Sequence, residues 1–460
     1  MESFSRIIGT IDGWLWGPWL LVVLFGTHLF MTIRTGFIQR KIGLGIKLSV
    51  TKDLDGVGDI SQFGALTTAL ASTIGTGNII GVGTAIALGG PGAVLWMWLA
   101  GIFGISTKYA ESLLAVKYRV KDENGMMLGG AMFVLERGLK MKWLGVLFAV
   151  FTAITAFGSG NGVQSNAIAN LMHESFSIPK WVTGIILAVL VAFVLIGGIK
   201  WITKVCEAMV PFMAIFYIVG CAIILVINRA YLGQSVQLIL DAAISPRAMG
   251  GGFVASSLMS GARYGIARGL FSNESGLGSA PIVAAAAQTR NPVRQALVSS
   301  TGTFWDTVII CLMTGLVVVS SVIANGDIDA LNDGGKLVHA AFDQIPVLGA
   351  IVLTFGLFIF AFSTILGWSY HGEKGAEYLF GPKSTIPFRI IYVIFTFLGT
   401  VLTIGVMWDL ADVLNALMSI PNLIAILLLS PEIAKLTKYY VYENHIDETD
   451  KTPIPLRTAS

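Results

Sequence analysis

Charged residues are scarce in this sequence. Asp, Glu, Lys and Arg account for 12% of its 460 residues, 55% of the residues are hydrophobic, and the mean hydropathy is +0.76. Soluble domains usually contain about 25% charged residues, so most of this chain is expected to lie in lipid. No polar region is long enough for a separate soluble domain, and we predict a single membrane transport domain over residues 1–460.

Cysteine is also rare, and its placement excludes two kinds of site. Cys206, Cys221 and Cys311 lie in or beside apolar stretches, without the pairing of a disulfide framework or the spacing of a zinc site. The formal net charge of +3 is too small to indicate nucleic-acid binding. No nucleophile with a base, pair of acids or metal cluster has the spacing of an active site, so an enzyme is not expected.

Apolar stretches long enough to cross a bilayer recur along the whole chain. A spanning helix needs about 20 mostly apolar residues, which predicts an all-α polytopic membrane protein with about eleven transmembrane helices. The approximate ranges are 14–33, 60–88, 91–117, 143–172, 179–199, 205–227, 250–288, 293–323, 345–370, 386–405 and 408–430. No small-residue cleavage site closes the first range, which favours a retained helix over a removed signal peptide.

Basic residues gather in alternate loops between these ranges, as is typical of the cytoplasmic side of a membrane protein. The opposite loops are poor in them, and one is acidic around Asp333 and Asp343. This pattern predicts an N-terminus outside a prokaryotic cell membrane and a cytoplasmic tail, residues 431–460. The basic set is Arg34, Arg40, Lys41, Lys47, Lys52, Arg119, Lys121, Arg137, Lys140, Lys142, Lys200, Lys204, Arg290, Arg294, Lys374, Lys383, Arg389, Lys435 and Lys438.

Two apolar ranges are interrupted by glycine and polar residues. The range 60–88 contains Ser72-Thr73-Ile74-Gly75-Thr76-Gly77-Asn78-Ile79-Ile80-Gly81-Val82-Gly83, and the range 250–288 contains Gly269-Leu270-Phe271-Ser272-Asn273-Glu274-Ser275-Gly276-Leu277-Gly278-Ser279-Ala280-Pro281. Unwound backbone at bilayer depth is tolerated only where it is buried or lines a polar cavity. Paired interruptions of this kind indicate the binding site of a transporter. Glycines alone could instead serve close helix packing, which explains the polar residues poorly.

The two interrupted ranges lie five helices apart. If residues 60–227 and 250–430 are structural repeats, each contains an odd number of crossings, so the repeats must have opposite orientations. The sequence therefore predicts a 5+5 inverted repeat that follows one extra helix, 14–33.

The sequence around the interruptions resembles a known family. The run from Ser72 to Gly83, the stretch from Gly261 to Gly278, and Gly367-Trp368-Ser369-Tyr370 followed by Gly372-Glu373 are similar to the alanine or glycine:cation symporter family, and the resemblance covers nearly the whole chain. It implies a LeuT-type fold of the amino acid-polyamine-organocation superfamily. It also implies sodium-coupled symport of small neutral amino acids, alanine and glycine, by alternating access.

The ends of the interrupted helices predict where an amino acid binds. Free amides carry partial positive charge and free carbonyls partial negative charge, which suits a zwitterion. We expect the carboxylate near Gly75, Thr76 and Gly77, which with Asn78 match the Gly-X-Gly-Asn segment of related LeuT-type carriers. The amino group is expected at the backbone of Phe271, Ser272 and Asn273.

Two further residues complete the predicted substrate site. Gln164 lies in an unusually polar stretch from Gly158 to Asn166 and is expected to reach the ligand, although a hydrogen bond between helices would also explain it. Trp368 is expected to form a wall of the pocket, although tryptophan is also frequent at membrane interfaces.

A hydroxyl pair, Ser363 and Thr364, predicts the site of the coupling cation. Sodium prefers hard oxygen ligands, but a Ser-Thr pair alone usually bonds to its own helical turn. The resemblance to LeuT-type carriers implies that these hydroxyls join the carbonyls of Ala71, Ile74 and Phe360 in a sodium site.

Acidic residues leave a second mechanism open. A proton-coupled amino-acid transporter on the same scaffold would use Glu274 or Asp306 as its titrating group. Glu274 could otherwise serve in gating, but an ion pair with Arg263 or Arg268 is favoured. Asp306 is expected to serve as a second cation site or as a satisfied interhelical acid. An ion channel is not favoured, because inverted halves of one chain do not form a symmetric filter ring.

Overall fold

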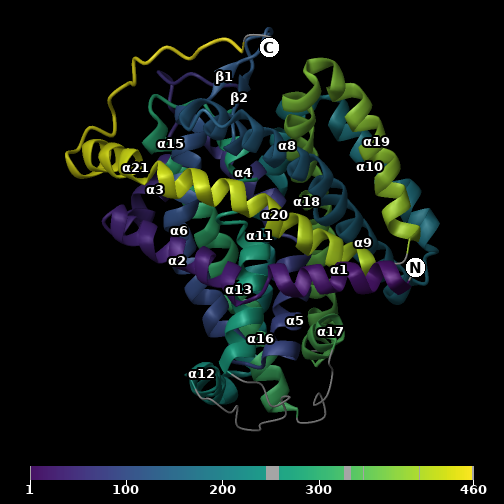
Figure 1. The fold of residues 1–460 in the computed structure, drawn as a ribbon. Helices are drawn as coiled ribbons and strands as arrows, with labels where there is room; N and C mark the ends of the chain where they lie inside the picture. Colours follow the sequence, from purple (N-terminus) through teal and green to yellow (C-terminus); the bar gives the residue numbers. More distant parts are fainter. Residues whose placement is uncertain (1, 245–257, 326–332, 345–346, 403–404, 458–460) are drawn as a thin grey trace.

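The computed structural model describes residues 2–244, 258–325, 333–344, 347–402 and 405–457, which are mainly helical (Figure 1). The chain begins with α1 (Glu2–Leu15) and α2 (Pro18–Arg34), which form a pair bent by 40°. The short helices η1 (Ile38–Lys41) and α3 (Ile42–Ser49) follow.

Residues 60–227, the first of the two predicted repeats, contain eleven helices and a small hairpin. The helices are α4 (Gln62–Thr73), η2 (Thr76–Asn78), α5 (Ile80–Gly89), α6 (Ala93–Lys117), α7 (Ala131–Phe133), η3 (Val134–Gly138), α8 (Lys142–Phe157), η4 (Gly158–Gly162), α9 (Val163–Phe176), α10 (Lys180–Ile196) and α11 (Gly198–Ile227). A small antiparallel hairpin, β1 (Val120–Lys121) and β2 (Met127–Leu128), follows α6, and α12 (Arg229–Ile244) follows α11.

The remaining elements follow residue 257. They are α13 (Leu258–Asn273), α14 (Pro281–Ala284), α15 (Pro292–Thr303), η5 (Phe304–Cys311), α16 (Leu312–Ala324), α17 (Gly334–Asp343), α18 (Leu348–Phe380), η7 (Pro382–Ser384), α19 (Thr385–Val401), α20 (Gly405–Leu428), α21 (Ser430–Thr437) and η8 (Lys438–Tyr442). The C-terminal segment then runs back over the same end of the molecule as the β1–β2 hairpin (Figure 1).

Seven helices within the described residues are long and apolar enough to cross a membrane, and the bent pair α1 and α2 would make an eighth. The predicted ranges coincide with helices or broken helices, although α11 starts earlier and α18 ends later than expected. Residues 250–257, where one predicted range begins, lie outside the described residues. The pattern does not predict α12 and α17, because both are shorter than a membrane span.

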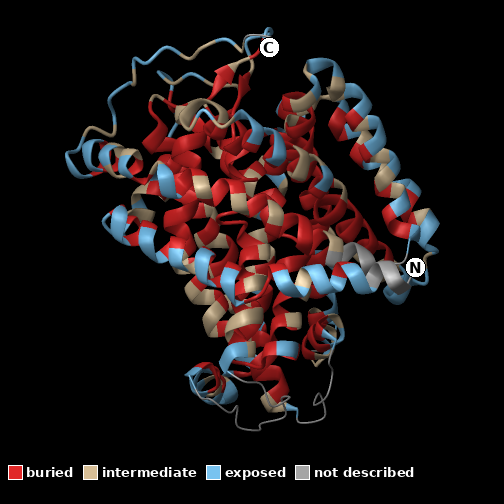
Figure 2. Ribbon diagram, in the orientation of Figure 1, coloured by how far each residue is buried: buried red, intermediate tan, exposed pale blue. Residues whose placement is uncertain are grey.

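Burial follows the pattern expected of a protein in lipid. Buried residues fill the centre of the molecule, whereas the outward faces of the peripheral helices α10 and α19 are exposed (Figure 2). Those faces carry large apolar side chains, among them Phe193, Ile196, Ile386 and Ile390. Extended exposed apolar faces are unfavourable in water and stable in lipid.

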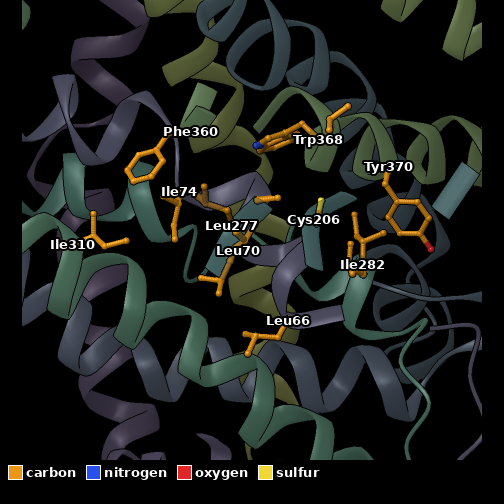
Figure 3. Packing of buried hydrophobic residues seen from close by; sticks show 14 of the residues in the cluster. Leu66, Leu70, Ile74, Cys206, Leu277, Ile282, Ile310, Phe360, Trp368 and Tyr370 are labelled. Carbon is orange, nitrogen blue, oxygen red and sulfur yellow. The ribbon is translucent and has the colours of Figure 1, made fainter. Parts of the chain in front are cut away.

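The two interrupted helices lie inside this core. Leu66, Leu70 and Ile74 of α4 belong to one buried cluster with Phe360 and Trp368 of α18 (Figure 3). Helix α13 packs against α5 and α6. The described residues therefore bury both breaks. Burial in protein is the condition for unwound backbone at membrane depth.

The segment before α4 is tied to the segment after α14. Arg119 donates hydrogen bonds to the carbonyls of Ala285 (3.0 Å), Ala287 (2.9 Å) and Val57 (2.8 Å). Burial lowers the pKa of Arg119 to about 10, so its guanidinium remains charged at neutral pH. Asp53 pairs with Arg290 at 2.8 Å nearby. These contacts lie at the end of the molecule that carries the β1–β2 hairpin (Figure 1).

Candidate functional site

The first interruption separates α4 from α5. Two glycines in the Gly75–Gly77 segment disfavour a helix by about 1 kcal/mol each, and Gly75 has the extended dihedral angles φ −141° and ψ −152°. In a regular helix the amide of Gly75 would donate to the carbonyl of Ala71, but here it donates to Asn78 Oδ1 at 2.9 Å. The amide of Asn78 likewise donates to Gly75 instead of Ile74. The carbonyls of Ala71 and Ile74 thus lose their usual helical donors.

The second interruption lies between α13 and α14. It is stabilised by backbone conformations that a helix does not allow, with φ of +55° at Glu274, +92° at Gly276 and +82° at Gly278. Pro281 then starts α14, because proline suits the first position of a helix.

Side chains capture the amides of the second interruption. The amide of Ser275 donates to Asn273 Oδ1 at 2.8 Å, and that of Gly276 donates to Glu111 Oε2 at 3.2 Å. In a regular helix these amides would have bonded the carbonyls of Phe271 and Ser272. The carbonyls of Phe271 and Ser272 therefore lose their usual helical donors, as the carbonyls of Ala71 and Ile74 do at the first break.

A small cavity lies between the two interruptions. Its volume is about 10 Å³, which is close to the minimum for one water molecule, so an amino acid can enter only if the walls move apart. The walls come from five parts of the fold: the first break, the second break, the η4–α9 region, α18 and α20. They are Ser72, Thr73, Gly75, Gly77, Ser159, Gln164, Phe271, Glu274, Thr364, Trp368 and Asn415.

The predicted substrate residues divide into two groups. Gly75, Gly77, Gln164, Phe271 and Trp368 line the cavity. Gln164 also accepts a hydrogen bond from the amide of Thr76 at 3.3 Å, which joins α9 to the first break.

The remaining predicted substrate residues, Thr76, Asn78, Ser272 and Asn273, do not line this cavity; the side chains of the last three bond to the surrounding helices. Asn78 donates to Asp306 Oδ1 at 2.7 Å, and Ser272 donates to Asp306 Oδ2 at 2.8 Å. Asn273 donates to Thr307 at 3.0 Å, and Thr307 in turn donates to Asp306 Oδ2 at 2.6 Å. Asp306 thus connects both breaks to η5, which is the satisfied interhelical arrangement that the sequence left open.

Four of the five predicted sodium ligands, Ile74, Phe360, Ser363 and Thr364, come together where α18 crosses the end of α4. The hydroxyl of Thr364 lies 3.2 Å from the carbonyl oxygen of Ile74 and 2.9 Å from that of Phe360. The hydroxyl of Ser363 is also 2.9 Å from the Phe360 carbonyl. Ala71 is fully buried one turn before Ile74 in α4. Hard oxygen atoms of the kind that sodium prefers therefore meet beside the cavity.

The expectation that Glu274 pairs with Arg263 or Arg268 is wrong. Glu274 accepts hydrogen bonds from Trp368 Nε1 at 2.9 Å and from the hydroxyl of Ser279. Arg268 instead pairs with Asp412 of α20 at 3.0 Å. The positive φ at Glu274 turns its side chain into the core, whereas Arg268 lies further back along α13, facing α20.

The Arg268–Asp412 pair lies at a second, much larger cavity. That cavity has a volume of about 1610 Å³, and its walls include Arg268, Asp412, Asp333 and Lys336. Arg268 and Asp412 are each three residues, less than one helical turn, before Phe271 and Asn415 of the small cavity. The ion pair therefore lies at the large cavity within one helical turn of residues that line the small one.

Glu274, Ser159 and Asn415 are site residues that the sequence pattern did not identify as ligands. Ser159 lies in the polar stretch that identified Gln164, and Asn415 is an isolated amide in an apolar helix, so both gave a usable signal. Glu274 was visible as an acid inside the second interruption, but the sequence assigned it to proton coupling or to an ion pair, because its orientation depends on the local turn of the chain.

A helical protein with an apolar exterior and two unwound helices around a buried polar cavity is a secondary transporter of the membrane. Comparison with known proteins agrees. The chain belongs to the sodium:alanine symporter family, whose model matches residues 1–453. It is therefore a multi-pass membrane protein of a transporter family and not an enzyme.

Individual relatives support this assignment. The sodium/alanine symporter AgcS of Methanococcus maripaludis is 47% identical over 446 residues, which are 95% of this chain and 97% of the relative. The structure of MhsT in complex with L-phenylalanine has a TM-score of 0.58 at 16% identity, with 81% of this chain and 89% of that chain covered. The structure of a Na⁺-coupled sialic acid symporter has a TM-score of 0.55 at 13% identity, with 90% of this chain and 86% of that chain covered. The last two show a shared transporter fold of the LeuT type.

Proposed function

We propose that this protein is a sodium-coupled symporter that carries small neutral amino acids, alanine and glycine, across the cell membrane. The observation that carries the proposal is the meeting of two interrupted helices at one buried cavity. Backbone amides and carbonyls that make no helical hydrogen bonds lie close together there. They suit a ligand with both a carboxylate and an ammonium group. The 47% identity to a sodium/alanine symporter supports the choice of substrate and ion.

The substrate lies across the cavity in this proposal. Its carboxylate faces the amides of Gly75, Thr76 and Gly77, with Asn78 holding that segment and Gln164 completing the wall. Its amino group faces the backbone of Phe271, Ser272 and Asn273. The sodium ion lies next to it, bound by the carbonyls of Ala71, Ile74 and Phe360 and the hydroxyls of Ser363 and Thr364. Trp368 limits the length of the substrate.

Transport proceeds by alternating access. Opening at the Arg268–Asp412 pair would join the small cavity to the large one. Opening on the opposite side would require the contacts of Arg119 and Asp53 to break. We assign the large cavity to the outside and the Arg119 end to the cytoplasm, because the basic loops lie at the Arg119 end.

The membrane topology follows from the same assignment. We propose eleven crossings: α2, with α1 as its bent extension, is the extra helix, and residues 60–227 and 250–430 form the inverted repeats. The N-terminus is outside, and the tail, residues 431–460, is cytoplasmic.

Uptake of labelled L-alanine into proteoliposomes tests the proposal. An inward sodium gradient is expected to drive accumulation, whereas a lithium gradient or a pH gradient alone is not. Accumulation driven by a pH gradient without sodium would favour proton coupling instead and would refute the sodium assignment.

A further inference from the structure

Glu274 has a special position among the ionisable residues of the core. It is the one Asp, Glu, Lys, Arg or His among the described residues that line the small cavity. Its side chain is 3% exposed, and its carboxylate is fixed by Trp368 Nε1 and by the hydroxyl of Ser279. Both partners are neutral, so they orient the carboxylate without supplying a positive charge.

Nearby cations bond to other carboxylates. Lys108 lies 3.4 Å from Glu111, and Arg268 lies 3.0 Å from Asp412. None of the ion pairs between described residues includes Glu274. A buried carboxylate is stable as an anion only if a positive charge and hydrogen bonds compensate for lost hydration. In a carrier of amino acids, the substrate itself brings such a charge.

A second polar group points to the same ligand chemistry. Asn415 of α20 is 2% exposed and lines the cavity, and its Oδ1 has no hydrogen-bond partner among the described residues. An unpartnered buried acceptor costs about 1–3 kcal/mol unless a ligand bonds to it. A donor in the cavity would satisfy it.

The chain segment that carries Glu274 is held firmly. The amide of Gly276 donates to Glu111, and the carbonyl of Gly276 accepts from Asn422 at 2.9 Å. Asn422 also donates to Glu111 at 2.8 Å. Helices α6 and α20 thus fix the peptide two residues beyond Glu274, which keeps its carboxylate at one place in the cavity wall.

We infer that the carboxylate of Glu274, together with Oδ1 of Asn415, receives the α-ammonium group of the substrate. This inference rests on the proposed function and adds a charged receptor to the backbone carbonyls already assigned to that group. In the proposed function the amides of Gly75 to Gly77 receive the carboxylate of the substrate, which replaces Asn78 and Gln164 as the acceptor for the amides of Gly75 and Thr76. The site then has opposite charge preferences at its two ends. It selects zwitterions and discriminates against molecules in which a hydroxyl replaces the ammonium group.

The test compares Glu274→Gln with Ser279→Ala. The glutamine variant keeps an oxygen acceptor for Trp368 but removes the charge, whereas the alanine variant removes one hydrogen bond to the carboxylate and keeps the charge. Ser279 does not line the cavity. Calorimetric titration with L-alanine in sodium buffer should show a Kd raised roughly tenfold or more in Glu274→Gln and about threefold or less in Ser279→Ala. The Kd of L-lactate, measured by competition with L-alanine, should change by about threefold or less in both variants.

Two results would overturn the inference. One is an alanine Kd in Glu274→Gln within about twofold of wild type. The other is equal weakening in the two variants, which would mean that the hydrogen bonds of Glu274 matter and its charge does not. If Glu274→Gln does not give monodisperse protein, Asn415→Leu decides in the same way. Wild type is titrated first: if it shows no sodium-dependent alanine binding, the proposed function fails, whereas tight alanine binding by both wild type and Glu274→Gln refutes this inference alone.

Discussion

The hydroxyl of Thr364 lies 3.2 Å from the carbonyl oxygen of Ile74, although 290 residues separate the two in the chain. This contact joins the middle of α18 to the end of α4, and Thr364 also lines the small cavity. A cation bound between these oxygens would hold the two helices together beside the substrate. In the proposed mechanism, sodium binding here would therefore favour closure of the cavity.

Replacing Ser363 and Thr364 by alanine should weaken sodium binding. Each hydroxyl that contacts a charged group contributes about 1.5–3 kcal/mol, so the sodium concentration for half-maximal alanine binding should rise roughly tenfold or more. Titration of alanine binding against sodium measures this. Ser369→Ala is the control, because the Ser369 hydroxyl bonds only to its own helix among the described residues. An unchanged sodium dependence would move the cation site elsewhere.

Gly75→Ala should impair the same site by a steric route. A Cβ atom at Gly75 would lie 2.5 Å from the hydroxyl oxygen of Thr364, so Thr364 would have to leave the Ile74 carbonyl. We expect sodium affinity to fall by about tenfold while the protein still folds. Gly81→Ala is the matched control, since its Cβ would have its nearest neighbour at 4.0 Å, which is ordinary contact. Equal sodium affinity in the two variants would contradict the geometry.

Asp306→Ala should destabilise the protein more than Asp306→Asn. The carboxylate accepts hydrogen bonds from Asn78, Ser272 and Thr307. Alanine would remove this shared acceptor and leave Asn78 and Ser272 only their longer contacts of 3.3–3.4 Å to the backbone of residue 306 and to Cys311. Each lost acceptor costs about 1–3 kcal/mol, and asparagine keeps one oxygen. Thermal unfolding in detergent, monitored by light scattering and intrinsic fluorescence, gives the Tm values of wild type and both variants. A Tm for Asp306→Ala equal to that of wild type would show that the network does not stabilise the breaks.

Features encoded in short segments could be predicted from the sequence. Glycines at Gly75 and Gly77 disfavour a helix wherever the segment lies, so the first break follows from local physics. The hydroxyl pair at Ser363 and Thr364 was also visible, and the structure brings Thr364 to the Ile74 carbonyl. In both cases the signal and its cause lie within a few residues.

Partner choice over long distances could not be predicted. Asn78 and Ser272 carry polar groups that a sequence assigns equally well to a ligand or to a neighbour, and the packing of η5 directs both to Asp306. Glu274 has arginines nearby in sequence, yet its positive φ directs it to Trp368, 94 residues away. Such choices depend on which helices pack together, and no local pattern records them.

Cysteine labelling should confirm the proposed topology. Lys336 in α17 and Lys47 in α3 are both exposed. With a membrane-impermeant thiol reagent on intact cells, Lys336→Cys should react and Lys47→Cys should react only after the membrane is opened. The unmodified chain is the control, because its three cysteines are buried. The reverse labelling pattern would invert the orientation and the assignment of the basic loops to the cytoplasm.

The cavity should accept only small side chains. Phe271 and Trp368 both line it, and a Cβ atom at Gly160 would lie 2.4 Å from the Cβ of Trp368, so the tryptophan cannot retreat in that direction. A buried methyl group gains about 0.8 kcal/mol, whereas an oversized side chain costs about 1–3 kcal/mol. Glycine, alanine and serine should therefore compete with labelled alanine uptake at least about tenfold better than leucine or phenylalanine.

Variants of the cavity wall should move this size limit. Phe271→Ala and Trp368→Ala are each expected to improve competition by leucine relative to alanine, because each removes a large side chain from the wall. Trp201→Ala, at a half-exposed tryptophan of α11, should leave the ratio unchanged and controls for the loss of an indole elsewhere. Strong inhibition of the wild type by leucine would refute the small-cavity prediction. An unchanged ratio in both wall variants would mean that other residues set the limit.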